Sequence, residues 1–172
     1  HIENCINNNR SFYNLIIQNL NKKDFSLNTF LELHRYHMPD ISLPEDTSFF
    51  LSSLNSRNIG FSILTDGRSV SQRNKLHALG IIKAAENIII SDETGYEKPH
   101  IFNFKILNDL YHDKKLIYIA DNPAKDFLAP KQLKWETICL LDNGENIHKQ
   151  NFNLEKKYIP NTIIKTFKEL KL

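Results

Sequence analysis

The chain has 172 residues, of which 41% are hydrophobic and 24% are charged, as in a globular protein with one ordinary core. The net charge of +2 and the even spread of lysines predict no nucleic-acid surface, and no apolar run approaches the roughly 18 residues of a membrane span. Cys5 and Cys139 match no metal or redox spacing, and Cys139 lies in an apolar stretch, so a reduced core thiol and a cytoplasmic protein are the default expectations.

Residues 1–57 are expected to be helical. Three segments carry apolar residues near a 3.6-residue period: 9–20, 26–37 and 43–58. Ser26 is a suitable N-cap for the second segment, and Pro44 with the acidic residues after it is typical of the start of the third. The aromatic residues of these helices are expected to face a core.

A different pattern begins at Ile59, where short apolar runs alternate with helical periodicity. Strands are expected at 59–65, 86–91, 115–120 and 135–141. Helices are expected at 69–79, ended by Gly80; at 98–111, with Pro99 in the first turn; and at 123–133. A short strand and then an amphipathic helix are expected within 156–170. Strands that are apolar throughout indicate a parallel sheet covered on both faces, an α/β, Rossmann-like three-layer core whose ligands gather at the carboxyl ends of the strands.

Polar groups follow several of these strands. Thr65 ends the first strand and is followed by Asp66, Gly67 and Arg68, while Lys98 precedes a helix. Asp121 and Asp126, five residues apart, follow the strand at 115–120. Taken singly, a strand-end threonine is usually a cap and a lysine before proline is usually solvated. The aspartate pair has two interpretations. Either Asp121 merely ends the strand and Asp126 lies on the next helix, or the two carboxylates form a metal site.

The order of these residues resembles the haloacid dehalogenase (HAD) superfamily, specifically its phosphatase-type members with a small helical cap. The resemblance lies in a strand ending in threonine, Lys-Pro 33 residues later, and Ala-Asp-x4-Asp 23 residues after that. It covers essentially the whole chain. It implies that residues 1–45 are a helical cap segment, with the helix at 44–57 leading back to the core, and that 46–172 are the HAD-like α/β core.

The resemblance also implies roles for these side chains. The Thr65 hydroxyl would hold a substrate phosphate, and Lys98 would offset negative charge on the phosphate and the aspartates. Asp121 would be a Mg²⁺ ligand, and Asp126 would complete or brace the metal shell. Oxygen ligands suit this hard cation, and a lysine beside a hydroxyl stabilises a transferring phosphoryl group. Four further residues are candidate substrate contacts: Asp66, Gly67, Arg68 and Asn122.

The sequence departs from the family pattern in three places. Ala120 stands where glycine usually precedes the first aspartate of the pair, and Asp66 stands where asparagine is common. The first motif, an apolar strand ending in Asp-x-Asp, is absent from these residues. In the family its first aspartate is the nucleophile and its second the general acid/base. Without it, the remaining residues are expected to bind phosphate and metal but not to run the covalent reaction.

In this fold the first strand lies in the middle of the sheet, between the strand ending at Thr65 and the strand ending at Asp121. Its absence would leave two apolar edges unpaired, which is an aggregation hazard. We therefore expect roughly 20 to 40 upstream residues, or another segment or chain, to fill the gap. Pairing between two copies of the chain is one way of filling it.

The interpretation favoured by the sequence is a Mg²⁺-dependent phosphatase of a small phosphorylated metabolite. The alternative is a catalytically inactive relative or fragment that binds phosphate or a protein partner. A receiver-like domain fits less well, since it needs an acidic pair after its first strand. The spacing of a zinc helix is absent from His34, His37 and Asp40, so this segment is expected to be a cap-to-core junction. Arg35 and His37 are further candidate substrate contacts there. Nothing in residues 1–57 identifies the substrate.

Overall fold

The structure is a computed structural model that describes residues 26–144, 146 and 149–170. The expected helix at 9–20 and Cys5 lie outside these residues. The helices are α3 (Leu27–Tyr36), α4 (Glu45–Ser56), α5 (Ser69–Ala78), α6 (Ser91–Thr94), α7 (Phe102–Leu110) and α8 (Leu128–Gln132), with short 3₁₀ turns η1 (Lys156–Tyr158) and η2 (Phe167–Glu169). The strands are β1 (Ser62–Thr65), β2 (Asn87–Ile90), β3 (Ile117–Ala120), β4 (Glu136–Leu140) and β5 (Thr162–Ile164). None of the helices in this part of the chain is both long and apolar enough to cross a membrane.

The strands form two parallel sheets, which confirms the expected α/β class. β1 pairs with β2, with Thr65 opposite Ile90. In the second sheet β3 pairs with β4 and β4 with β5, and Ala120 lies opposite Cys139. All pairings are parallel, so the residues that follow Thr65 and those that follow Ala120 emerge at the carboxyl ends of their own sheets.

β1 and β3 each have one edge that pairs with no other strand of the described residues. Within the described residues β1 hydrogen-bonds only to β2, and β3 only to β4 among its strand neighbours. Ile117 on β3 is 46% exposed, although it belongs to an apolar strand. This arrangement agrees with the expected place of the missing strand, between the strand ending at Thr65 and the one leading to Asp121.

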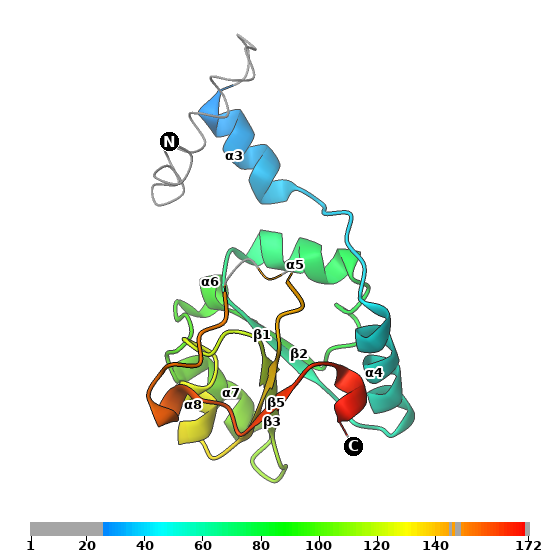
Figure 1. Ribbon diagram of the computed structural model, residues 1–172. Coiled ribbons are helices and arrows are strands. Elements are labelled where there is room, and N and C mark those ends of the chain that lie inside the picture. Colours follow the sequence, from blue (N-terminus) through cyan, green and yellow to red (C-terminus); the bar gives the residue numbers. More distant parts are fainter. Residues whose placement is uncertain (1–25, 145, 147–148, 171–172) are drawn as a thin grey trace.

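A single core joins both sheets on the face covered by α7 and α8. Phe104 on α7 is fully buried and packs edge-on against Tyr118 of β3 and against Trp135, with centroid distances of 5.0 and 5.8 Å. Leu64 of β1 and Ala129 of α8 belong to the same cluster. Figure 1 shows α7 and α8 on one side of the strands and α4 on the other. The sheets are therefore covered on both faces, as the apolar strands predicted.

Helix α4 packs against the C-terminal part of the chain rather than only against its sequence neighbours. Phe50 stacks on Phe167 of η2 at 4.6 Å, and Leu54 is also buried. The expectation that the N-terminal aromatic residues face the core holds for Phe50 but is wrong for Phe49 and for Tyr36 of α3, which are 68% and 61% exposed. One apolar face is enough to seat α4, and Phe49 lies off that face.

The amphipathic helix expected at the C-terminus is wrong. Residues 162–164 form β5, and the segment then ends in η2. Thr166 caps this turn: its hydroxyl accepts from Lys168 N, and its N–H donates to Glu169 Oε1. The Asn161 side chain accepts hydrogen bonds from the Thr137 backbone and hydroxyl at 3.0 and 2.6 Å, which aligns the segment for pairing with β4. The expected short strand is thus confirmed as β5, and only a 3₁₀ turn follows it where the helix was expected.

Helix α3 begins as predicted, because the Ser26 hydroxyl accepts a hydrogen bond from Thr29 N at 3.1 Å. None of its residues is buried. Its C-terminal end is held to α5 by Ser71, whose hydroxyl donates to Arg35 O, and by Asn74, whose amide donates to His37 O. The division into a cap segment at 1–45 and a core at 46–172 stays a prediction.

Candidate functional site

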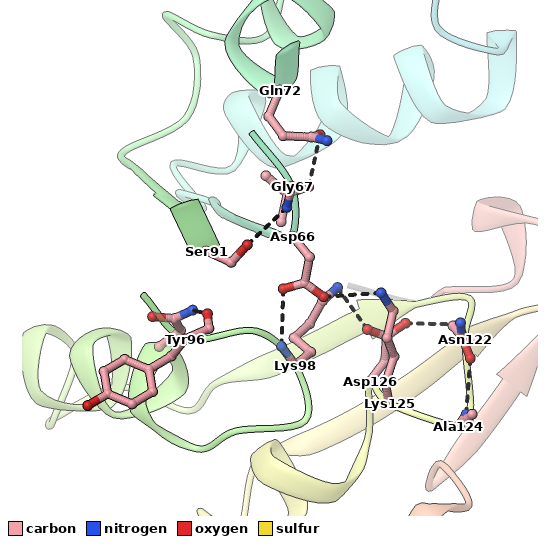
Figure 2. Close-up of polar contacts among 12 residues, drawn as sticks. Asp66, Gly67, Gln72, Ser91, Tyr96, Lys98, Asn122, Ala124, Lys125 and Asp126 are labelled. Carbon is pink, nitrogen blue, oxygen red and sulfur yellow. Dashed lines mark hydrogen bonds and ion pairs between the residues drawn. The ribbon is translucent and has the colours of Figure 1, made fainter. Parts of the chain in front are cut away.

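The end of β1 is a tight turn fixed by side chains from α5 and α6. Gly67 has φ +123° and donates its N–H to the Ser91 hydroxyl at 2.9 Å (Figure 2). A Cβ at Gly67 would lie 2.7 Å from Gln72 Nε2, and φ is in the region that favours glycine. Thr65 donates its hydroxyl proton to Gln72 Oε1 at 3.1 Å. The turn therefore requires glycine and holds the Thr65 hydroxyl at the strand end.

Asp66 connects this turn to two other segments. Its Oδ1 accepts from Lys98 N and its Oδ2 from Lys125 Nζ, both at 3.1 Å, and only 12% of its side chain is exposed (Figure 2). Both carboxylate oxygens are engaged within the protein. Asp66 thus braces the site, and its predicted role as a substrate contact stays a prediction.

Lys98 lies between the two sheets. Its Nζ is 2.8 Å from Oδ1 of Asp126, with 11% and 2% of the two side chains exposed, and it donates to the Tyr118 hydroxyl at 3.4 Å. The expected start of a helix at Pro99 is wrong. His100 N donates to Glu97 O and closes a turn at 97–100, so α7 begins only at Phe102. The turn directs the lysine towards the aspartates instead of to solvent.

A compact loop joins the two aspartates after β3. Asn122 N donates to Asp126 Oδ2 and Asp126 N donates to Asn122 O, both at 2.9 Å. The Asn122 side chain accepts from Ala124 N at 3.1 Å. These bonds explain why α8 begins at Leu128 and not at residue 123, as the sequence suggested. The side-chain carbonyl oxygen of Asn122 already accepts from Ala124 N. A substrate contact by Asn122, which stays a prediction, would therefore fall to its side-chain NH₂ group.

The donor set at this edge fits a hard dication. Asp121 is exposed, whereas Asp126 is 1% exposed and its Oδ1 has no well-aligned hydrogen-bond donor, although Lys98 is an ion-pair partner. Magnesium is usually held by one or two carboxylates, waters and substrate phosphate oxygens. Among the described residues, no group of three or more His, Cys, Asp or Glu side chains is arranged to hold a metal, and this includes His34, His37 and Asp40. The assignment of Asp121 and Asp126 to Mg²⁺ stays a prediction.

Burial and the negative charge at this edge of the sheet raise the pKa of two neighbouring groups, Tyr118 and Cys139. Burial raises the pKa of Tyr118 well above its usual value, and the carboxylates of Asp126, Asp66 and Asp121 raise it further. Burial and then Asp121 and Asp126 raise the pKa of Cys139 to about 12. Tyr118 thus remains a neutral phenol at pH 7, and Cys139 is a buried, unpaired thiol, as expected from its apolar strand.

Asn146 and Gln150, which no sequence motif indicated, hold Asp121 from the loop that follows β4. Asn146 Nδ2 donates to Asp121 Oδ2 at 3.0 Å. Gln150 Nε2 lies 2.7 Å from both Asp121 O and Leu140 O, and its Oε1 accepts from Asp142 N at 3.0 Å. One amide therefore ties the ends of β3 and β4 together beneath the exposed carboxylate.

Replacing Gln150 with alanine is expected to lower the free energy of unfolding by about 1–3 kcal/mol, since carbonyls at the strand ends lose their donor. Urea unfolding followed by circular dichroism measures the change. Gln132→Ala, at an exposed glutamine of α8, is the matched control and is expected to change stability by less than about 0.5 kcal/mol. Equal stability of the two variants would show that the Gln150 bonds contribute nothing.

A cavity of about 390 Å³ opens beside the turn at Gly67. It is lined by Gly67, Arg68, Ser91, Asp92, Gly95 and Glu97. Arg68 is exposed and is the residue before α5, and Glu97 precedes Lys98. Arg68 therefore lines a hollow together with Gly67 and Glu97, and its predicted role as a substrate contact stays a prediction.

The sequence matches the haloacid dehalogenase-like hydrolase family over residues 1–140. It is 29% identical over 93 residues to the glyceraldehyde 3-phosphate phosphatase of Methanocaldococcus jannaschii, an alignment that covers 53% of this chain and 41% of that protein. This chain thus spans less than half the length of that relative.

Two solved structures share the fold. The HAD phosphatase from Thermococcus onnurineus has a TM-score of 0.63 at 20% identity, with 85% of this chain and 63% of that one covered. The magnesium-bound HAD-hydrolase YfnB from Bacillus subtilis has a TM-score of 0.56 at 20% identity, with coverage of 73% and 52%. The family match, which spans most of the sequence, confirms the resemblance that the sequence predicted. The chain belongs to the haloacid dehalogenase-like hydrolase family.

Proposed function

We propose that this chain supplies the phosphate- and metal-binding part of a Mg²⁺-dependent phosphatase that acts on a small phosphorylated metabolite. The observation that carries the proposal is the buried Lys98–Asp126 pair at 2.8 Å, next to the exposed Asp121. A buried ammonium group beside a carboxylate is suited to offsetting charge as a dianionic phosphate arrives. The family membership and the phosphatase named above support the reaction class.

In the proposed site each residue has one task. Thr65 donates a hydrogen bond to a phosphate oxygen when its hydroxyl turns from Gln72, and the Gly67 turn keeps the backbone close to the phosphate. Lys98 balances the charge of the phosphate and Asp126. Asp121 and Asp126 would hold Mg²⁺, which would neutralise phosphate oxygens. Arg68 reaches the non-phosphate part of the substrate from the adjoining cavity.

The chain's own residues do not include the Asp-x-Asp nucleophile motif. The alternative function is therefore phosphate binding without turnover, by an inactive relative or fragment that acts through a ligand or a protein partner. The same pocket serves both functions, so binding and catalysis have to be measured separately.

The test compares the 172-residue chain with a longer form in which an apolar strand ending in Asp-x-Asp is present. Both are titrated with inorganic phosphate in the presence of Mg²⁺ by calorimetry, and both are assayed for phosphate release from a panel that begins with glyceraldehyde 3-phosphate. Binding by both forms and turnover by the longer form alone are expected. Binding without turnover by either form would favour the inactive alternative, and no binding by either form would refute the proposed function.

A further inference from the structure

Lys125 belongs to none of the motifs described above, yet it meets the site directly. It lies one residue before Asp126, and its Nζ is 3.1 Å from Oδ2 of Asp66 (Figure 2). The pair joins the loop after β3 to the end of β1, across the two strand edges that have no backbone pairing with each other. A side-chain ion pair thus takes the place of a ladder between the two sheets at this point.

The carboxylates around this pair outnumber the lysines by three to two. Three carboxylates, those of Asp66, Asp121 and Asp126, act together on the Tyr118 hydroxyl. Lys98 has its ammonium group 2.8 Å from Asp126. Lys125 is consequently the side-chain cation that offsets Asp66, whose carboxylate is only 12% exposed and is poorly screened by water.

The position of Asp66 makes this balance important for an anion. Asp66 directly follows Thr65, whose hydroxyl is the proposed hydrogen-bond donor to the phosphate. A carboxylate there with no cation to balance it would repel a phosphate dianion. Asp66 also accepts a hydrogen bond from Lys98 N at 3.1 Å. An asparagine at this position would keep an oxygen for that bond and carry no charge, so it would remove the need for a balancing lysine.

We propose that Lys125 is a positioning residue that neutralises Asp66 and so allows the proposed phosphate site at Thr65 and Lys98 to accept a phosphate dianion. This inference rests on the proposed function and extends it to a charge pair that the motifs described above do not include. Lys125 acts through Asp66 and does not itself bind the phosphate.

The experiment measures the affinity of the full chain for inorganic phosphate by calorimetry at constant Mg²⁺. Lys125→Met, which keeps the length of the side chain, is expected to weaken binding by about tenfold or more, since it leaves the charge of Asp66 unbalanced. Adding Asp66→Asn to Lys125→Met is expected to restore the affinity to within about threefold of the wild type. Urea unfolding of the same variants identifies a merely structural role of Lys125, which would lower the free energy of unfolding of Lys125→Met in parallel with its phosphate affinity, whereas the proposed role lowers the affinity of a protein that stays folded.

Lys115→Met is the matched control. Lys115→Met makes the same change in net charge as Lys125→Met. Lys115 pairs with Glu136 at 3.6 Å at the start of β4, which is the opposite end of the sheet from the site. It is expected to alter phosphate affinity by less than about twofold, because exposed charges at that distance are screened by salt.

Equal affinity of Lys125→Met and the wild type would overturn the inference. So would a loss that Asp66→Asn does not restore, because Lys125 would then contact the phosphate itself. If Lys125→Met does not fold, the double variant is compared with Asp66→Asn alone, where equal affinities support the inference and a weaker double variant overturns it. Failure of the wild type to bind phosphate would refute the proposed function and the inference with it, whereas wild-type binding with no effect of Lys125→Met refutes the inference alone.

Discussion

Replacing Asp121 with asparagine is expected to abolish Mg²⁺-dependent phosphatase activity in a form of the protein that carries the Asp-x-Asp strand. Asparagine keeps the size of the side chain but removes the negative charge that a hard dication needs. Asp121 is the exposed member of the pair, so it is the carboxylate that water and a metal can reach. A loss of several kcal/mol of charge stabilisation corresponds to a fall in kcat/KM of more than about 100-fold.

The same substitution can be tested without turnover. In the 172-residue chain, Asp121→Asn is expected to weaken Mg²⁺ binding by at least about tenfold, measured by calorimetry. Asp113→Asn is the matched control, since Asp113 is 63% exposed in the loop before β3, at the amino end of the sheet. Unchanged Mg²⁺ affinity together with full activity of the Asp121 variant would remove this residue from the metal site.

Much of the fold follows from local patterns, and the wrong predictions concern contacts that such patterns do not reveal. The apolar runs at β1, β2, β3 and β4 predicted strands correctly because parallel strands buried on both faces carry no polar alternation. The starts of α7 and α8 were placed too early, because the turn at 97–100 and the Asn122–Asp126 loop depend on bonds that periodicity does not reveal. The short C-terminal strand is confirmed as β5, but the helix expected after it is only the 3₁₀ turn η2.

The candidate site shows the same division between local and distant information. The order of threonine, lysine and two aspartates could be read along the chain, and the structure places Lys98 against Asp126 from segments 28 residues apart (126 − 98). The partners that hold these groups come from other elements. Lys125 meets Asp66, and Gln150 holds the backbone of Asp121, and no spacing rule predicts either contact. The sequence thus indicates which side chains are candidates for the reaction. The contacts that hold those side chains in place depend on how the two sheets pack.

Replacing Lys98 with alanine is expected to weaken binding of inorganic phosphate and also to lower stability. The lysine is 11% exposed and its partner Asp126 is 2% exposed, so the substitution leaves a buried carboxylate without its cation. Breaking such a pair lowers the free energy of unfolding by about 3–5 kcal/mol. Urea unfolding measures the stability change, and calorimetry measures phosphate affinity. Lys105→Ala, at an exposed position on α7, is the matched control and is expected to change neither strongly.

A double variant separates the two roles of Lys98. Lys98→Ala combined with Asp126→Asn removes the unbalanced buried charge, and the amide oxygen of the substituted side chain can still accept from Asn122 N, whose bond to Asp126 is 2.9 Å long. Most of the lost stability is therefore expected to return, by about 2 kcal/mol or more. Phosphate affinity is expected to stay low, because the cation that faces the phosphate is still absent. Recovery of phosphate affinity along with stability would show that Lys98 only balances Asp126, and unchanged affinity in Lys98→Ala itself would exclude the lysine from the site.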